Sequence, residues 1–180
     1  MSRNLNDLHP YVKYLCEQFL EKCKAAGLHP TITSTLRTNQ EQADIYASGR
    51  TKPGPVLSYT KAGYSMHNYG LAFDCSFPAT EYAKAAAIGK ALGLTWGGDF
   101  VVNGKPFIDR PHFQWTGGLT TAQLLAGKRP ENPLKKDKHK EIVKKFQHLT
   151  GLVEDGIDGP ITEAKAREVL EMIKEILGKV

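Results

Sequence analysis

The sequence predicts a mixed protein of helices and short strands. Segments with helical apolar spacing alternate with short β-branched segments along the first 126 residues. A chain of 180 residues is long enough to bury a core of its own. No segment approaches the roughly 18 consecutive apolar residues that a membrane-spanning helix requires. These observations predict a globular domain of ordinary size, with room for a small appendage.

Five segments have the composition or apolar spacing of helices: 8–26, 40–48, 80–92, 141–150 and 161–177. Either Asn6 or Asp7 is the expected N-cap of the first helix, and Asn39 that of the second. The last helix is expected to have an apolar side made of Ile161, Ala164, Val169, Ile173, Ile176 and Leu177.

Strands are expected over residues 31–36 and 71–77 and within 107–115, where β-branched and aromatic residues alternate with others. Residues 49–64 contain several glycines and prolines and are predicted to form a long loop. A loop of this length in a compact domain usually borders a functional site. The segment Trp96-Gly97-Gly98 is expected to be a turn.

Cysteine content and net charge narrow the range of possible functions. Cys16, Cys23 and Cys75 form no CxxC pair, and we expect buried thiols rather than a disulfide framework. The net charge of +5 favours polyanionic partners. However, the basic residues are spread along the chain and form no dedicated stripe, so no nucleic-acid interface is expected.

The composition changes near residue 128. Two prolines and a run of lysines between residues 128 and 140 predict an exposed linker. We therefore expect a principal domain over 1–127, a linker over 128–140 and a small helical module over 141–180.

Two clusters of polar residues could hold a metal ion. The first contains His67 and Asp74, and the second contains Asp109 and His112. A catalytic zinc ion has three protein ligands and one open position for water, so His67, Asp74 and His112 are a candidate ligand set. The alternative, which spacing alone leaves open, is a pair of ordinary histidines hydrogen-bonded near a carboxylate.

Two further charged residues suit hydrolysis beside such a metal ion. Asp109 stands three residues before His112, where its carboxylate could act as a general base. Arg37 follows the first expected strand and could stabilise an oxyanion. Taken alone, Arg37 could equally be a surface charge.

These clusters resemble the VanY-like family of D-alanyl-D-alanine carboxypeptidases and, within it, the bacteriophage endolysins that are L-alanyl-D-glutamate peptidases. The shared motifs are Ser-x-His-x-x-Gly-x-Ala-x-Asp at 65–74 and Asp-x-x-His at 109–112. The resemblance covers roughly residues 5–125, and several further stretches match in order: Leu36-Arg37-Thr38 with Gln42, Gly49-Arg50-Thr51, and residues 94–99 and 111–115.

The resemblance implies an α+β fold in which helices flank a small antiparallel sheet, followed by a small C-terminal helical module. It implies a zinc peptidase with one Zn²⁺ per chain on His67, Asp74 and His112. The implied substrate is peptidoglycan, whose stem peptide would be hydrolysed between L-Ala and D-Glu.

The same resemblance assigns roles to other residues. It implies Asp109 as the general base and places Arg37 near the scissile carbonyl. Substrate contacts are expected from Ser65, Trp96 and Gln42. No residue would be acylated, so Ser65 is not expected to be a nucleophile.

The C-terminal segment is similar, over a shorter stretch, to the peptidoglycan-binding type 1 module. The matching residues are Val143–Gln147, Leu152, Asp155–Pro160 and Thr162. Beyond Thr162 the match ends, because Lys165 stands where the module usually has alanine. The resemblance implies a tether that raises the effective concentration of the enzyme on the wall. The alternative is a helical extension packed against the principal domain.

Three other functions remain open. One is D-Ala-D-Ala carboxypeptidase activity of the same family. The second is a non-catalytic, zinc-stabilised wall-binding module, against which Asp109 argues, since a structural metal site has no need of a base. The third, a basic nucleic-acid binder, is supported by net charge alone.

The first ten residues contain no apolar segment of the kind found in secretory signals. We therefore expect synthesis in the cytoplasm and action on the cell wall after release, as for a phage lysin that lyses its host and has antimicrobial activity. A monomer without membrane insertion is expected.

Overall fold

The structure is a computed structural model that describes residues 1–102, 104–152, 154, 156–157 and 159–177. For residues 136–139 and 174–177 it describes the backbone alone. The chain separates into two compact units, the first ending at Glu131 and the second beginning at Asn132.

Four short antiparallel strands form the central sheet of the first unit. Their order is β1 (Thr31–Ser34), β2 (Ala72–Ser76), β6 (His112–Gln114) and β3 (Thr95–Trp96). Phe73 of β2 lies opposite Phe113 of β6, and Asp74 lies opposite His112. Since successive residues of a strand point to opposite faces, the phenylalanines share one face and Asp74 and His112 share the other.

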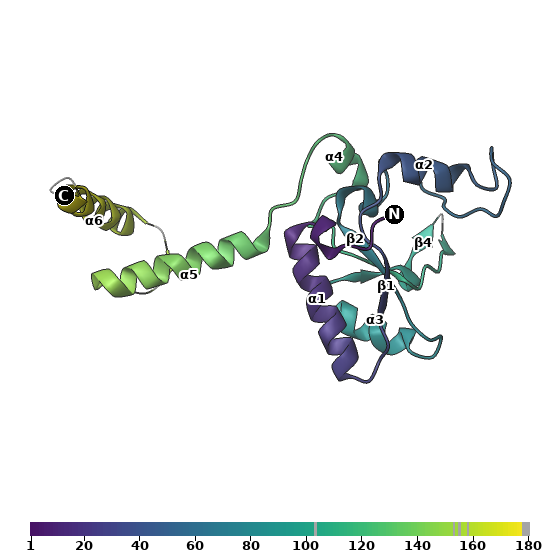
Figure 1. The fold of residues 1–180 in the computed structure, drawn as a ribbon, viewed down its shortest axis with the longest axis horizontal. Helices are drawn as coiled ribbons and strands as arrows, with labels where there is room; N and C mark the ends of the chain where they lie inside the picture. Colours follow the sequence, from purple (N-terminus) through teal and green to yellow (C-terminus); the bar gives the residue numbers. More distant parts are fainter. Residues whose placement is uncertain (103, 153, 155, 158, 178–180) are drawn as a thin grey trace. The chain divides into compact units, whose positions relative to one another are not determined.

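Helices α1 (Pro10–Ala25) and α3 (Tyr82–Ala91) pack on the apolar face of this sheet (Figure 1). The ring of Phe19 in α1 lies 4.6 Å from that of Phe113 and 5.6 Å from that of Phe73. Gly89 of α3 lies so close to Phe113 that a Cβ there would approach the ring to 2.7 Å. This packing confirms the predicted α+β fold with a small antiparallel sheet and flanking helices.

All three cysteines lie in this core. Cys16, Cys23 and Cys75 are buried as free thiols, as predicted. Cys75 is paired with Ile32 across β1 and β2, and it follows Asp74, so its side chain points to the apolar face.

The predicted N-cap of the first helix is wrong. A short 3-10 helix, η1 (Leu5–Asp7), precedes α1, and Asn4 caps it by accepting from the Asn6 backbone N–H. The ring of His9 then caps α1 by accepting from the Tyr11 N–H. Because Asn6 and Asp7 belong to the extra turn, neither of them can cap α1.

The second helix begins one residue earlier than predicted. Helix α2 (Asn39–Ala47) has Thr38, not Asn39, as its N-cap. The Thr38 hydroxyl accepts from the Glu41 N–H, and the Glu41 carboxylate accepts from the Thr38 N–H. This reciprocal pair satisfies two N–H groups at once, which the single bond of an asparagine cap would not do.

Residues 49–64 form a long loop, as predicted, with an isolated bridge between Ser48 and Lys52. Among the short elements that were not predicted are strands β4 (Val101–Val102) and β5 (Lys105–Pro106), which pair as a hairpin, and helix α4 (Thr121–Leu125). Elements this short carry too few residues to show periodicity. The predicted turn at Trp96 is instead the end of β3, followed by the 3-10 helix η3 (Gly97–Asp99).

The second unit consists of α5 (Pro133–Thr150) and α6 (Pro160–Leu177). The segment expected to be a linker over 128–140 is helical from Pro133 onward. Asn132 caps this helix and Pro133 occupies its first turn, a pair of residues that favours a helix start. Lysine is a good helix former, so the lysine run continues the helix.

The buried Gln147 joins the two helices of this unit. Its amide donates to the Ile157 carbonyl and to the Thr162 hydroxyl and accepts from the Gly156 N–H. Asp155 and Asp158, which the resemblance to the wall-binding module included, lie outside the described residues.

The expected apolar side of the last helix is largely exposed where its side chains are described, with Val169 half-buried. Ile161 is 74% exposed and Ile173 45% exposed, and Ala164 is exposed as well. The side chains of Ile176 and Leu177 are not among those described. Apolar periodicity predicts a face without showing that another element covers it. In the part of the chain that the structure describes, no helix combines the length and apolarity needed to cross a membrane.

Candidate active site

A cavity of about 930 Å³ lies on the polar face of the sheet in the first unit. Its floor contains the strand residues Asp74 and His112, with His67 beside them. The long loop 49–64 and the β4–β5 hairpin also contribute to its lining. The two polar clusters of the sequence, 65–74 and 109–115, therefore meet in one cavity.

His67 is held by the short 3-10 helix η2 (Met66–Tyr69). Gly70 ends that helix with a positive φ of 65°, and a Cβ there would lie 2.8 Å from the Asp7 carbonyl oxygen. His67 is 2% exposed, and its Nδ1 lies 2.7 Å from the Thr35 carbonyl oxygen. Since a carbonyl can only accept, Nδ1 donates this bond and Nε2 keeps a free lone pair.

His112 is oriented by a residue of its own strand. Its Nε2 lies 2.9 Å from the Gln114 side-chain oxygen. Residues two apart on a strand share a face, so Gln114 stands beside the ring it holds. The amide oxygen accepts from Nε2–H, which leaves the lone pair of Nδ1 directed toward Asp74.

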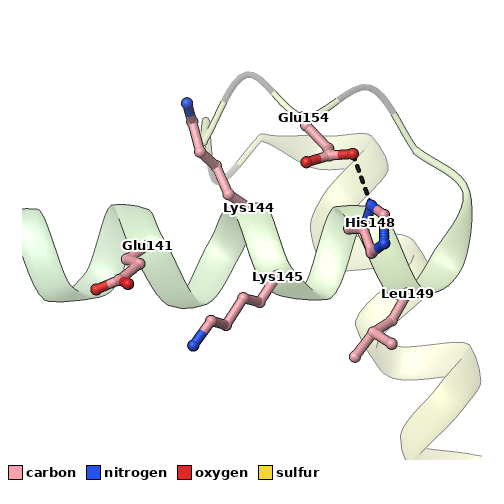
Figure 2. Close-up of a pocket in the computed structure, with 6 residues that line it drawn as sticks. All are labelled: Glu141, Lys144, Lys145, His148, Leu149 and Glu154. Carbon is pink, nitrogen blue, oxygen red and sulfur yellow. Dashed lines mark hydrogen bonds and ion pairs between the residues drawn. The ribbon is translucent and has the colours of Figure 1, made fainter.

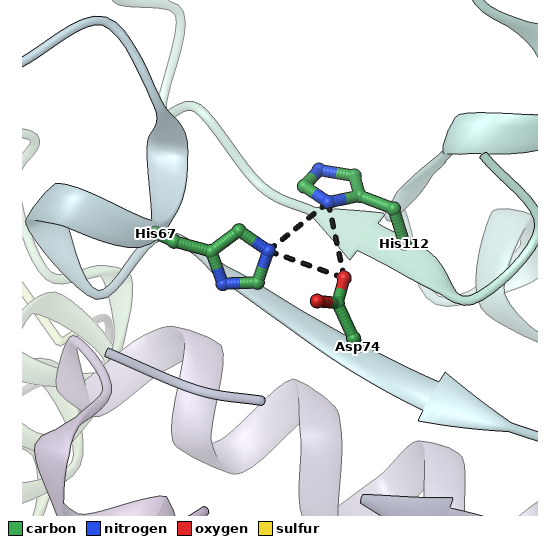
Figure 3. A group of neighbouring side chains, drawn as sticks. All are labelled: His67, Asp74 and His112. Carbon is green, nitrogen blue, oxygen red and sulfur yellow. Dashed lines mark hydrogen bonds and ion pairs between the residues drawn. The ribbon is translucent and has the colours of Figure 1, made fainter. Parts of the chain in front are cut away.

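Three atoms that could ligate a metal ion converge on the floor of the cavity (Figure 3). His67 Nε2 lies 3.2 Å from Asp74 Oδ1 and 3.2 Å from His112 Nδ1, and His112 Nδ1 lies 3.3 Å from Asp74 Oδ1. Tetrahedral zinc with bonds of about 2.0 Å separates its ligands by about 3.3 Å. The three residues are also a group whose ligand atoms could hold a metal ion. The donor spacing therefore fits one small tetrahedral cation.

The charges of the cluster also favour a cation. Burial acts to raise the pKa of Asp74, but the interactions with His112 and His67, in their protonated form, outweigh burial and hold that pKa below its usual range. Burial acts to lower the pKa of His112, but bonding to Asp74 and Gln114 and the charge of Asp74 raise it. The protein thus stabilises a carboxylate and a positive charge among these donors, and a metal ion can supply that charge in place of a proton.

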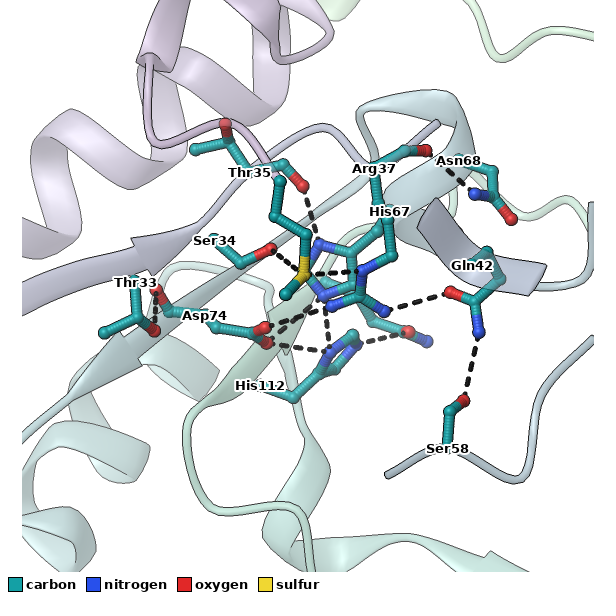
Figure 4. Close-up of polar contacts among 12 residues, drawn as sticks. Thr33, Ser34, Thr35, Arg37, Gln42, Ser58, His67, Asn68, Asp74 and His112 are labelled. Atoms are coloured by element: carbon teal, nitrogen blue, oxygen red, sulfur yellow. Dashed lines mark hydrogen bonds and ion pairs between the residues drawn. The ribbon is translucent and has the colours of Figure 1, made fainter. Parts of the chain in front are cut away.

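Arg37 reaches into the same cavity (Figure 4). Its Nη2 lies 3.6 Å from Asp74 Oδ2, and its Nη1 donates to the Gln42 side-chain oxygen at 3.0 Å. The Met1 sulfur accepts from Arg37 Nε at 3.1 Å. Burial lowers the pKa of Arg37, while the charge of Asp74 opposes that shift.

Asp109 lines the cavity just before the strand that carries His112. Burial raises the pKa of its carboxyl, and nearby Asp74 adds to this while His112 opposes it. Gly97 makes this position possible, because a Cβ there would lie 2.4 Å from the Asp109 carbonyl oxygen and 2.8 Å from His112 Cβ. A weakly solvated carboxylate thus stands beside the three donor atoms.

Two residues expected to contact substrate do not line the cavity. Gln42 is fully buried and uses its amide within the protein, donating to the Ser58 hydroxyl and to the Thr60 carbonyl. Trp96 donates from its indole to the Arg110 carbonyl at 2.7 Å and so holds the segment before His112. These bonds give both residues a supporting position, and their contact with substrate stays a prediction. Ser65, in contrast, does line the cavity.

Several residues of the site were not identified from the sequence. Gln114 orients His112, and its place two residues further along a strand was a usable signal. The aromatic residues Tyr59 and Phe107, whose ring centroids are 5.5 Å apart, line the cavity from the loop and the hairpin. Their pairing depends on the path of a loop, for which the sequence held no periodic signal.

A second, shallower hollow lies along α5 in the second unit (Figure 2). His148 bonds to the Glu154 carboxylate there at 2.8 Å. Lysines line it as well, and both the histidine and the glutamate are exposed. The charged groups of this hollow remain accessible to solvent.

The family model of VanY, described as D-alanyl-D-alanine carboxypeptidase, matches residues 5–96, just over half of the chain. The matched range includes His67 and Asp74 and ends before Asp109 and His112. The chain belongs to this family.

Two curated proteins are similar to the chain. One is the peptidoglycan L-alanyl-D-glutamate endopeptidase CwlK of Bacillus subtilis, 32% identical over 127 residues, which cover 61% of this chain and 74% of that protein. The other is the L-alanyl-D-glutamate peptidase of a Listeria phage, 27% identical over 119 residues, which cover 62% of this chain but 39% of that protein.

Two solved structures are also similar. The L-Ala D-Glu endopeptidase ChiX of Serratia marcescens has a TM-score of 0.45 and 21% identity, over 68% of this chain and 87% of that one. The LD-carboxypeptidase LdcB has a TM-score of 0.49 and 16% identity, over 69% of this chain and 78% of that one.

Proposed function

We propose that the protein is a zinc-dependent peptidoglycan endopeptidase that hydrolyses the bond between L-Ala and D-Glu of the stem peptide. The observation that carries this proposal is the triangle of His67 Nε2, Asp74 Oδ1 and His112 Nδ1, with edges of 3.2 to 3.3 Å, on the floor of a cavity of about 930 Å³. The two curated relatives, both L-alanyl-D-glutamate peptidases, support the choice of bond.

One Zn²⁺ per chain would be held by His67, Asp74 and His112. When bound, such an ion supplies Lewis-acid chemistry, polarising a carbonyl and lowering the pKa of water toward about 7. The bonds that the two rings donate to the Thr35 and Gln114 oxygens fix which nitrogen of each histidine is available, so the ligands are oriented in advance.

The remaining steps fall to two charged side chains. Asp109 accepts a proton from the attacking water as the new C–O bond forms, and it then delivers the proton to the departing amide nitrogen as the C–N bond breaks. Its burial raises its proton affinity, which suits a group that must take up and return a proton. The Arg37 guanidinium stabilises negative charge that develops on the carbonyl oxygen, a contribution of about 10²–10³ in turnover for one oxyanion donor.

The test is mass spectrometry of purified peptidoglycan after incubation with the protein, with and without a zinc chelator. New termini at L-Ala and D-Glu that disappear with chelator are expected. Intact peptidoglycan in both samples would contradict the proposal. Release of terminal D-Ala instead would favour carboxypeptidase activity, which the description of the matched family supports as the second candidate.

We further propose that the protein acts as a lysin on the bacterial wall and that residues 141–180 bind peptidoglycan. The phage relative supports the first part, and the accessible charges around Lys145 and His148 support the second. Co-sedimentation of the full chain with insoluble peptidoglycan tests the second part. A Lys145→Ala, Leu149→Ala variant is expected to sediment less, whereas equal sedimentation would indicate a helical extension without wall affinity.

A further inference from the structure

The mouth of the active-site cavity is unusually rich in exposed apolar side chains. Ten large apolar side chains are exposed among the described residues of the first unit, and five of them line the cavity: Met1, Leu57, Tyr59, Tyr64 and Val102. Exposed apolar surface concentrated in one place marks a contact site rather than ordinary surface. The substrate therefore meets an apolar, partly aromatic wall beside the polar floor.

Tyr59 is the most exposed of these aromatic residues, at 68%. The Arg50 guanidinium lies over its ring, 5.6 Å from the centroid, and the Phe107 ring meets it at an interplanar angle of 86°. Arg50 is itself held, because it donates to the Ser58 carbonyl and packs 4.1 Å from the centroid of the Tyr46 ring. The ring of Tyr59 is thus supported by neighbours while most of its surface stays open.

The chemistry of the proposed substrate places a sugar close to the scissile bond. In peptidoglycan, L-Ala is joined to the lactyl group of N-acetylmuramic acid, so the sugar is one short unit away from the scissile residue. Extended units span about 3.3–3.6 Å each, which puts the sugar about 7 Å from the scissile carbonyl. An enzyme that cuts after L-Ala must therefore accommodate a saccharide at the edge of its cavity.

We infer that Tyr59 forms a saccharide platform on which the muramyl residue stacks, with Phe107 and Arg50 positioning the ring. This inference rests on the proposed function and extends the same site from the peptide to the glycan. The negative face of an aromatic ring attracts the polarised C–H groups of a sugar. A ring with a supported position and an open surface offers that contact at little entropic cost.

The test compares two soluble substrates that differ in the sugar: N-acetylmuramyl-L-Ala-D-γ-Glu-L-Lys and the free tripeptide L-Ala-D-γ-Glu-L-Lys. For the wild-type protein, kcat/KM is expected to be higher for the muramyl substrate. Tyr59→Leu is expected to lower the ratio of the two kcat/KM values about tenfold. Tyr59→Phe, which keeps the ring, is expected to preserve the ratio. The matched control is Tyr14→Leu, an exposed tyrosine of α1 away from the cavity.

A second readout does not depend on turnover. Ring-current shifts of the sugar protons of N-acetylmuramyl-L-alanine are expected in NMR spectra with the wild-type protein and are expected to vanish with Tyr59→Leu. An unchanged ratio in Tyr59→Leu would overturn the inference, and so would an equal loss in Tyr59→Phe. If the wild-type protein cleaves neither substrate but the sugar protons still shift, the proposed function fails while the saccharide site stands.

Discussion

Asp74 and His112 face each other across two neighbouring antiparallel strands, with Oδ1 and Nδ1 3.3 Å apart. Direct cross-strand neighbours on one face have Cβ atoms about 4.5–5.5 Å apart, so both side chains can reach one point between them. The sheet thus fixes two of the proposed zinc ligands through backbone pairing, and η2 supplies the third.

The first prediction concerns metal content. The wild-type protein is expected to bind one zinc ion per chain, as measured by elemental analysis after dialysis, and zinc should raise its melting temperature because it binds only the folded state. His112→Ala is expected to lose the ion. His148→Ala serves as the control, since that histidine is exposed and pairs with Glu154 in the other unit. Zinc retained in His112→Ala would exclude this ligand set.

The second separates metal binding from proton transfer. Asp109→Asn is expected to keep zinc but to lose about 10²–10⁴ in kcat, the usual contribution of a general base. The control is Asp99→Asn, at an exposed carboxylate that pairs with Lys90. Near-normal turnover of Asp109→Asn would show that another group takes up the proton.

The third addresses the support of His112. Gln114→Ala removes the acceptor of the His112 Nε2–H and is expected to weaken zinc affinity about 10–100-fold. Gln114→Glu keeps an acceptor at that position and is expected to retain most of the affinity. Competition with a zinc-binding dye measures both. Equal affinities for all three proteins would mean that the bond does not orient the ring.

The fourth concerns Gln42, which bonds to Arg37, Ser58 and Thr60. Gln42→Ala leaves half-buried partners unsatisfied and is expected to lower the free energy of unfolding by about 1–3 kcal/mol. It should also lower kcat, because Arg37 loses its anchor. Gln40→Ala, on the same helix but exposed, should change neither quantity in urea titrations and assays.

The fifth concerns the thiols and pH. Burial raises the pKa of Cys23 from 9.0 to about 11 and that of Cys75 to about 12. Near pH 8 the folded protein is expected to resist thiol reagents, whereas the unfolded chain should react at all three cysteines.

These raised pKa values make the free energy of unfolding depend on pH. Above pH 9.0 the unfolded thiols ionise while the folded thiol of Cys23 stays protonated until about pH 11. The unfolded state then binds fewer protons, so the free energy of unfolding should fall as the pH rises through that interval. Rapid labelling of the native protein would contradict the burial of the thiols.

The proposed ligands could be named from the sequence because their motifs are local. His67 and Asp74 lie within ten residues of each other in a recognisable motif, and His112 lies in a second one. Their meeting in space could not be derived, because it depends on the antiparallel pairing of β2 with β6, and spacing along the chain does not specify which strands pair. The resemblance to a known family indicated that the three residues share one site.

Other features of the structure could not be predicted from the sequence, for physical reasons that differ from case to case. The lysine run at 135–140 looked like a solvated linker, yet Asn132 and Pro133 start a helix there. Gln42 and Trp96 are predicted to contact substrate because their motifs surround the site, and in the structure their polar atoms bond to Arg37 and the Arg110 carbonyl. Proximity in a motif does not tell which way a side chain points.

The two histidines present different nitrogens, Nε2 from His67 and Nδ1 from His112, since Thr35 and Gln114 occupy the others. The available nitrogen of His67 therefore lies about one bond length farther from its own backbone than that of His112. Amide isosteres should follow the same difference: glutamine mimics a histidine that ligates through Nε2, and asparagine mimics one that ligates through Nδ1. Any redesign of this centre for another metal has to treat positions 67 and 112 as side chains of unequal length rather than as a symmetric pair.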